Sequence, residues 1–309
     1  MPTTTFRANT FTSSGSPRLR RLAWPCGLLL ATACGTAASQ SQDACALLPE
    51  VPKNALVDIP FDTVDGRIYV QARVNGRGPF RFAIDTGASG LARADASLVS
   101  ALGLGVHGQA ETSDGMQTKS VQTTHLQSLE LGALVATGLE VITRDYSGGK
   151  TPDAAFAGII AREFFADGLL VIDYPGKTLR FTRSQALAPG MVNVLAYERA
   201  FRVPVRIGTL QTTGNLDTGA NVAFVLPTTL YQHISDTPLE QAGRGQLTNG
   251  DVETQRATLH GPFRIGNSQW SDVEVRVVDG YPELLVGAHA LQHRILMIDQ
   301  RSKTVALCD

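Results

Sequence analysis

Alternating hydrophobic and polar residues recur in the two halves of the chain and predict two similar sets of short β-strands. Residues 68–74 and 80–84 alternate around an Asn-Gly turn signal and lead to Asp85. This combination is typical of a β-hairpin. Residues 201–207, followed by a turn and a short apolar run, lead in the same way to Asp217. The pattern therefore predicts a duplicated structure built mostly from β-strands.

Helical spacing is rarer in this sequence than strand alternation. The apolar residues between positions 91 and 102 recur at helical spacing and stop at Gly103, which predicts one helix, and residues 227–234 predict a second. Further short strands are expected at residues 120–125, 126–131, 139–142, 169–173 and 178–181. Strands therefore dominate the predicted structure in both halves.

The second half repeats the first at matched distances. Polar turns suited to the tips of flaps occur at Asp114-Gly115 and Asn249-Gly250, with Gly115 30 residues after the first aspartate and Gly250 33 residues after the second. Apolar segments at 158–161 and 284–287 also correspond, and an Asp lies 12 residues after the end of each. Two copies of about 120 residues predict two β-rich lobes related by a pseudo-twofold axis.

Composition divides the chain into a leader and two lobes. Residues 1–38 are expected to form the leader, residues 39–185 the first lobe and residues 186–309 the second. Residues 182–200, which contain a Pro-Gly pair, are expected to link the lobes. The formal net charge is −1, so the chain has no basic excess that would attract nucleic acid.

Each apolar run ends in the same short motif. The first is Asp85, Thr86 and Gly87, followed by Ala, and the second is Asp217, Thr218 and Gly219, again followed by Ala. A carboxylate just past the end of a strand is held rigidly, and the glycine lets the backbone fold back beneath it. Two such carboxylates in matching surroundings predict a facing pair.

These residues resemble the aspartic peptidases over roughly residues 68–307. The resemblance rests on the Asp-Thr-Gly-Ala motif, the following Ser89 or Asn221, the flap turn and the later apolar segment. The retroviral-type branch is more similar than the pepsin branch, because Ala88 and Ala220 stand where pepsins carry Ser or Thr. Retroviral enzymes supply one such motif per subunit, whereas this chain carries both. It therefore resembles a bacterial fused form that is bilobal like pepsin.

The resemblance implies an all-β fold of two barrel-like lobes with a cleft between them. It also implies that Asp85 and Asp217 activate a water for peptide-bond hydrolysis, and that Thr86 and Thr218 hydrogen-bond across the lobe interface. Two close carboxylates cannot both ionise easily, so the pair shares one proton. Aspartic proteases are the standard case of this behaviour. A peptide or protein substrate, a monomeric enzyme, and no metal or cofactor are expected.

The chain departs from the family pattern in three places. Ala161 stands where the family usually has Gly, Asn215 stands where apolar residues are commoner, and neither flap turn carries the tyrosine of a pepsin-type flap. These departures leave a second interpretation open. The protein could instead be a peptide-binding module of the cell envelope that kept the cleft and lost catalysis.

The leader predicts export. Three arginines at positions 18–21 precede an apolar run at 22–33, which is too short to span a bilayer. This order is typical of a secretory signal peptide. Cys34 resembles the acceptor cysteine of bacterial lipoproteins, so the alternatives are lipidation at Cys34 and plain cleavage. We expect a periplasmic or cell-envelope protein, or a secreted one.

Two cysteines remain after the leader, Cys45 and Cys308, at the two ends of the mature chain. In an oxidising compartment they can form a disulfide that joins the ends. The sequence alone leaves this alternative and two free thiols open.

Overall fold

The computed structural model describes residues 42–48, 52–148, 151–199 and 201–309. The expected leader and Cys34 lie outside these residues. Among the described residues, no helix is long and apolar enough to cross a membrane.

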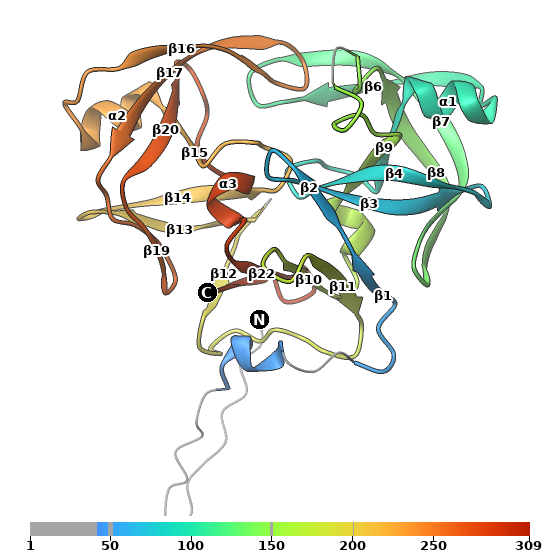
Figure 1. Ribbon diagram of the computed structural model, residues 1–309, viewed down its shortest axis with the longest axis horizontal. Helices are drawn as coiled ribbons and strands as arrows, with labels where there is room; N and C mark the ends of the chain where they lie inside the picture. Colours follow the sequence, from blue (N-terminus) through green and yellow to red (C-terminus); the bar gives the residue numbers. More distant parts are fainter. Residues whose placement is uncertain (1–41, 49–51, 149–150, 200) are drawn as a thin grey trace, which may run out of the picture. The chain divides into compact units, whose positions relative to one another are not determined.

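The first lobe is built on an eight-stranded sheet (Figure 1). Its strands, in spatial order, are β2 (Asp62–Val64), β3 (Arg67–Val74), β4 (Arg77–Asp85), β9 (Gly158–Ala161), β5 (Ala92–Asp95), β8 (Leu134–Arg144), β7 (Thr118–Leu131) and β6 (Val106–Ser113). Strand β7 also pairs with β3, so the sheet curls towards a barrel. Helix α1 (Ala96–Leu102) and the 3₁₀ helix η2 (Arg162–Phe165) complete the lobe.

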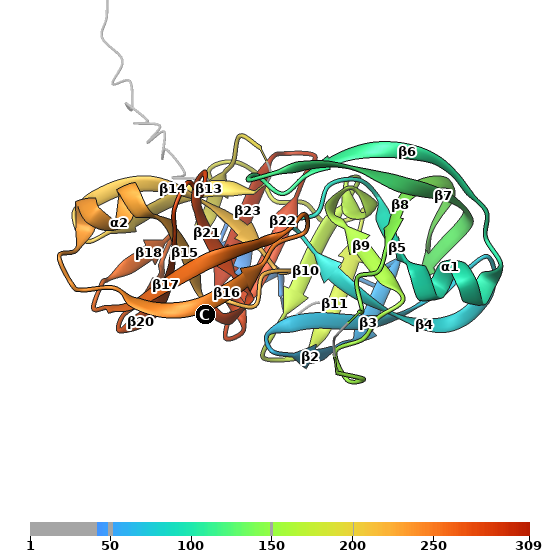
Figure 2. The same cartoon turned by 90° about the horizontal axis from the view of Figure 1, so that it is seen from above.

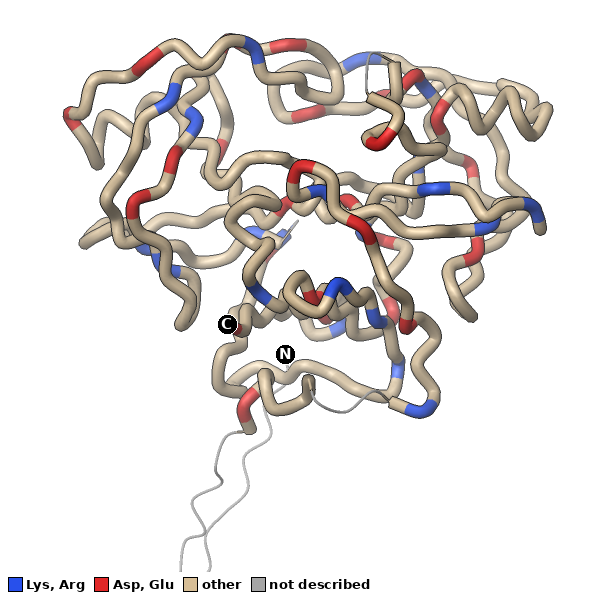
Figure 3. Tube along the Cα trace, viewed as in Figure 1, with Lys and Arg blue, Asp and Glu red and all other residues tan. Residues whose placement is uncertain are grey.

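The second lobe repeats this plan in a nine-stranded sheet. Its strands, in spatial order, are β16 (Glu240–Gln246), β17 (Asp251–Leu259), β20 (Val273–Val278), β15 (Phe224–Pro227), β21 (Leu284–Gly287), β14 (Leu210–Asp217), β13 (Arg202–Ile207), β18 (Phe263–Ile265) and β19 (Ser268–Trp270). Helices α2 (Thr228–Ile234) and α3 (Ala288–Leu291) follow β15 and β21. Basic and acidic residues are interspersed over both lobes (Figure 3).

A third sheet of six strands joins the lobes. Its strands, in spatial order, are β1 (Val57–Pro60), β11 (Thr178–Thr182), β10 (Leu169–Asp173), β22 (Ile295–Asp299), β23 (Thr304–Cys308) and β12 (Val194–Ala196). The central pair is β10 and β22, which run antiparallel with Val171 opposite Met297, and Figure 2 shows them between the lobes. This sheet takes strands from both sides of residue 185. The division of the chain into two lobes at that residue stays a prediction.

The all-β, bilobal architecture expected from the sequence is confirmed. The hairpin before Asp85 is present as β3 and β4, with Ile68 opposite Ile84. Its counterpart before Asp217 is β13 and β14. Duplication of the alternating pattern thus produced duplicated sheets.

The helix predicted for residues 91–102 is wrong in its first third. Residues Ala92–Asp95 form β5, which is buried between β8 and β9. The helix starts only at Ala96, because Asp95 is its N-cap and accepts a hydrogen bond from the Ser97 backbone N–H (2.9 Å). Sheet pairing on both sides of β5 outweighs the local helical spacing.

Two smaller predictions also need correction. The strands expected at residues 120–125 and 126–131 are one continuous strand, β7, because both parts pair with β8. The predicted linker at 182–200 is not structureless, since it contains β12, which pairs with β23. The segment that connects the two lobes thus adds a strand to the sheet that joins them.

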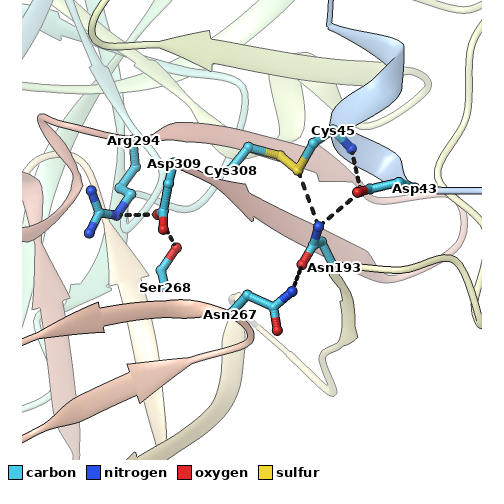
Figure 4. The surroundings of a disulfide bond; sticks show 8 residues. All are labelled: Asp43, Cys45, Asn193, Asn267, Ser268, Arg294, Cys308 and Asp309. Atoms are coloured by element: carbon cyan, nitrogen blue, oxygen red, sulfur yellow. Dashed lines mark hydrogen bonds and ion pairs between the residues drawn. A yellow bond between two sulfur atoms is a disulfide. The ribbon is translucent and has the colours of Figure 1, made fainter.

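The two ends of the described chain are joined at the base of this third sheet. Cys45, in the 3₁₀ helix η1 (Ala44–Leu47), forms a disulfide with Cys308 at a sequence separation of 263, with 5.8 Å between their Cα atoms. Figure 4 shows Asn193 from the linker beside the bridge, donating to Asp43 (2.9 Å). The bridge therefore closes almost the entire described chain.

Removing the bridge should destabilise the protein strongly. The chain-entropy treatment of so long a loop gives a loss of about 3–5 kcal/mol in the free energy of unfolding. Denaturant unfolding of the purified protein with its bridge intact, compared with its Cys45→Ser/Cys308→Ser variant, measures this difference. Reduced wild-type protein is the control and should match the variant. An unchanged midpoint would contradict the prediction.

Candidate active site

Asp85 and Asp217 occupy equivalent positions at the ends of β4 and β14. Each strand pairs in parallel with a shorter buried strand, which places Asp85 opposite Ala161 and Asp217 opposite Gly287. Parallel pairing on a buried strand holds the end of each aspartate strand in place. Ala161 is accommodated here with no exposure to solvent, so the departure from glycine at this position leaves the pairing intact.

The two carboxyl groups meet between the lobes. A Cβ added to Gly87 would lie closer than 3.0 Å to the carboxyl of Asp217, and one added to Gly219 would lie equally close to that of Asp85. Each carboxyl therefore packs on the backbone of the opposite loop, which is why both loops need glycine. The Asp85 carboxylate also accepts from the Ala88 N–H (2.9 Å).

Electrostatics at this pair favour a shared proton. Burial, and then the nearby Asp85 carboxyl, raise the pKa of Asp217 to about 7, and the two carboxyls are in hydrogen-bonding contact. The Gly219 N–H, which donates to Asp217 at 2.8 Å, and the Arg67 guanidinium act in the opposite direction but more weakly. The pair therefore carries one proton over a broad pH range.

The two threonines interlock the loops, in the contact that the resemblance implied. The Thr86 N–H donates to the Thr218 hydroxyl (3.1 Å), and the Thr218 N–H donates to the Thr86 hydroxyl (3.0 Å). Each hydroxyl in turn donates to the opposite lobe, Thr86 to the Leu216 carbonyl (3.1 Å) and Thr218 to the Ile84 carbonyl (2.9 Å). Because both threonines are buried, these bonds fix the distance between the aspartates.

A cleft of about 700 Å³ opens above the pair and is lined by both lobes. Its upper edge is formed by two hairpin tips, one between β6 and β7 and the other between β16 and β17 (Figure 1). The flap residues predicted from sequence, Asp114-Gly115 and Asn249-Gly250, lie at these tips. Asp114 and Gly115 line the cleft together with the aspartates, whereas Asn249 and Gly250 lie behind its lining, against Asp114 and Gln117.

The two hairpin tips are joined by hydrogen bonds. Asp114 accepts from the Asn249 N–H (2.6 Å), and the Asn249 side chain donates to the carbonyls of Thr112 and Gln117 (2.8 Å each). Arg144 donates to Asn249 from the opposite lobe (3.1 Å). Asn249 is only 2% exposed, so this contact closes the top of the cleft.

Sequence reasoning missed two tyrosines beside the aspartates. Tyr146 and Tyr281 follow β8 and β20, the strands that pair in parallel with β5 and β15, and both line the cleft. Burial raises the pKa of both phenols, and the charge of Asp85 adds to this at Tyr146 and that of Asp217 at Tyr281. The two tyrosines share one weak sequence signal: each lies one or two residues after an Asp that follows its strand.

Arg67 is a third missed residue. Its Nε donates to the Gly219 carbonyl (2.6 Å), and its Nη2 donates to Asn221 (3.1 Å). The side chain thus ties the first lobe to the second Asp-Thr-Gly loop. An arginine just before the predicted strand at residues 68–74 gave no local sign of this role.

The other repeated aspartates, Asp173 and Asp299, lie in the joining sheet and hold turns. Asp173 accepts from the Gly176 N–H (2.7 Å), and the fully buried Asp299 accepts from the Leu187 N–H (3.1 Å) and pairs with Arg301. Among the described residues, no group of three or more His, Cys, Asp or Glu side chains is placed to hold a metal ion.

Comparison with known proteins places this geometry in a family. A family model described as aspartyl protease matches residues 70–164 and 203–291, which together make up more than half of the chain. Comparison with curated proteins found no match. Each matched region contains one Asp-Thr-Gly loop and the parallel-paired strand beside it. The chain therefore belongs to the aspartyl protease family.

Proposed function

We propose that this protein is an aspartic endopeptidase that hydrolyses peptide bonds with a water activated between Asp85 and Asp217. The observation that supports it best is the contact between the two carboxyls at the base of a cleft, with the pKa of Asp217 raised to about 7. One ionised and one protonated carboxyl in contact supply a base and an acid at the same point.

The chemistry needs only these two groups and water. The ionised carboxylate takes a proton from the water as the oxygen attacks the scissile carbonyl carbon. The protonated carboxyl donates a hydrogen bond to the carbonyl oxygen, which becomes the hydroxyl of a tetrahedral intermediate. The carboxyl that took the proton of the water then gives it to the leaving nitrogen as the C–N bond breaks. One hydroxyl of the intermediate returns a proton to the other carboxylate as the carbonyl re-forms, so the pair ends singly protonated.

The hairpin contact supports the finer assignment to a fused retroviral-type enzyme. Both lobes contribute a hairpin tip, and the tips bond to each other through Asp114 and Asn249. A polypeptide reaches the aspartates only when these tips separate, so the hairpins act as a pair of flaps. Because both aspartates lie in one chain, we propose a monomeric enzyme.

The proposed location is the bacterial periplasm or cell envelope, or the outside of the cell. The signal-peptide pattern of residues 1–38 supports export, and Cys34 supports a lipid anchor as the alternative to plain cleavage. The Cys45–Cys308 disulfide supports an oxidising compartment.

Replacement of either aspartate by asparagine should abolish most peptide cleavage. An amide can neither take the proton of the water nor share one with its neighbour, so Asp85→Asn and Asp217→Asn should each lower kcat by roughly 100- to 10,000-fold. The double variant should be little worse, because the pair works as a unit. Cleavage of an unfolded protein substrate measures the loss.

Asp173→Asn is the matched control, since it makes the same change at a turn outside the cleft and keeps an acceptor for Gly176. It should retain full activity. Substantial turnover by a folded single-aspartate variant would contradict the proposal. A wild-type protein that binds peptides without cutting them would favour the binding-module interpretation.

Activity and stability should both depend on the proton held by the pair. Cleavage should fall as pH rises above about 7, because Asp217 then loses the proton that it donates to the carbonyl. A carboxyl with a raised pKa in the folded state stabilises the fold while protonated, and that stabilisation is lost as pH rises from its ordinary value through about 7.

Asp217→Asn removes this dependence. Thermal unfolding at acid and at mildly alkaline pH should therefore show a smaller loss of stability for the variant than for the wild type. An equal loss in both proteins would contradict the raised pKa.

A monomeric enzyme should show constant activity per chain on dilution. Initial rates measured over a wide range of protein concentrations check this expectation. The Asp85→Asn and Asp217→Asn proteins, mixed in equal amounts, provide the control and should not restore activity. A steep rise in activity per chain with concentration would indicate that the site needs a second chain.

A further inference from the structure

The pseudo-twofold symmetry of the cleft breaks at one pair of wall residues. Arg93 on β5 lies opposite Ile159 on β9, and Val225 on β15 lies opposite Leu285 on β21. Both pairs have the same position relative to the aspartate strands, and all four residues line the cleft. One wall therefore presents a guanidinium where the other presents an isopropyl group.

Arg93 is buried without a charged partner. It is 6% exposed, its Nε is buried with no hydrogen-bond partner, and it forms no ion pair with any described residue. A buried, unpaired guanidinium is costly, so such groups are normally paired. By contrast, two other cleft arginines have carboxylate partners: Arg244 pairs with Glu253 (2.9 Å) and Arg276 with Glu274 (3.1 Å).

The nearby carboxylate on the same strand is already occupied. Asp95 accepts from the Ser97 N–H and hydroxyl through one oxygen and from the N–H groups of Tyr146 and Ser147 through the other. The loop after β8 also contains Asp145, which lines the cleft and accepts from the Gly148 N–H. No carboxylate of this wall therefore neutralises Arg93.

Two further groups beside Arg93 also have unused donors. Arg93 lies within hydrogen-bonding reach of the buried Tyr146 hydroxyl and its charge lowers the pKa of that phenol, while the hydroxyl proton has no acceptor among the described residues. The Arg144 guanidinium lies over the Tyr146 ring, 5.7 Å from its centre, with Nε and Nη2 unpartnered. Two cations and a phenol thus converge on one wall, and all three can donate to an anion.

We propose that Arg93, with Arg144 and Tyr146, forms a subsite that takes an acidic side chain of the substrate, next to the scissile bond on the first-lobe side. The inference rests on the proposed peptidase function. A Glu or Asp carboxylate supplies the missing partner of Arg93 and accepts from the phenol. The equivalent subsite around Val225 and Leu285 takes an apolar side chain.

This difference also fixes the direction of the bound peptide. A symmetric pair of aspartates would cut a peptide bound in either direction, because the two carboxyls exchange roles. An acidic residue drawn to Arg93 favours one direction only, and the wrong direction places that carboxylate against Val225, where it would be desolvated without a partner.

Matched peptides that differ only in Glu or Gln at one position test the subsite. Wild-type enzyme should cut the Glu peptide with a kcat/KM roughly 10- to 100-fold higher than the Gln peptide when the residue lies on one side of the bond. Arg93→Val should abolish this preference. Arg276→Gln, which changes an arginine that already has a partner, should keep it.

Exchanging the two wall residues gives the sharpest test. In the Arg93→Val/Val225→Arg variant, the acidic preference should move to the other side of the scissile bond. Val225 is only partly buried, so the single variant Val225→Arg keeps the test available should Arg93→Val fold poorly. The single variant should accept acidic residues on both sides. A wild type without acidic preference, or an Arg93→Val enzyme that retains it, would overturn the proposal.

A binding measurement distinguishes failure of this subsite proposal from failure of the proposed peptidase function. Fluorescence anisotropy with a labelled Glu peptide and the Asp217→Asn protein should show binding that Arg93→Val weakens roughly 10- to 100-fold. Binding that depends on Arg93 without any cleavage by wild type would keep the subsite and reject the peptidase. Cleavage without discrimination between Glu and Gln would keep the peptidase and reject the subsite, and absence of both would reject the subsite as well.

Discussion

The whole arrangement depends on the close contact between the two Asp-Thr-Gly loops. Asp85 packs against Gly219 and Asp217 against Gly87, so a side chain at either glycine would displace a carboxyl. The hydrogen bonds of the two threonines cross from one loop to the other and are buried. The contact that joins the lobes is therefore the same contact that brings the carboxyls together. The aspartates cannot move apart unless the interface between the lobes also breaks.

Contacts between the lobes differ in kind from the base to the top of the cleft. At the base, β10 and β22 are paired along their full length, and the Cys45–Cys308 disulfide closes the chain beside them. At the top, the contact consists of a few hydrogen bonds around Asp114 and Asn249. Local opening occurs where fewer contacts are broken. The hairpin tips are thus the part that can separate while the aspartates stay in place.

The two lobes are alike in their Asp-Thr-Gly loops and differ along the walls of the cleft. The aspartate, threonine and glycine of each loop correspond one to one. Along the walls, Arg93 corresponds to Val225, and Ala83 corresponds to Asn215, because each pair lies opposite equivalent residues of β9 and β21. A polypeptide has a direction, so a cleft that binds it in one orientation needs unlike walls around like carboxyls.

The sequence by itself determined the two aspartate loops, the hairpins that lead to them and the bilobal β fold, because alternation and turn chemistry are local signals repeated twice. The tertiary structure decided what depends on neighbours distant in sequence. Residues 92–95 became a strand because β8 and β9 flank them. The sequence left open whether the two cysteines form a disulfide or remain free thiols. They are bridged because the two ends of the chain pack on one sheet. Arg93 gave no local signal in the sequence. Whether a buried side chain has a partner depends on all the residues packed around it, and these are distant in sequence.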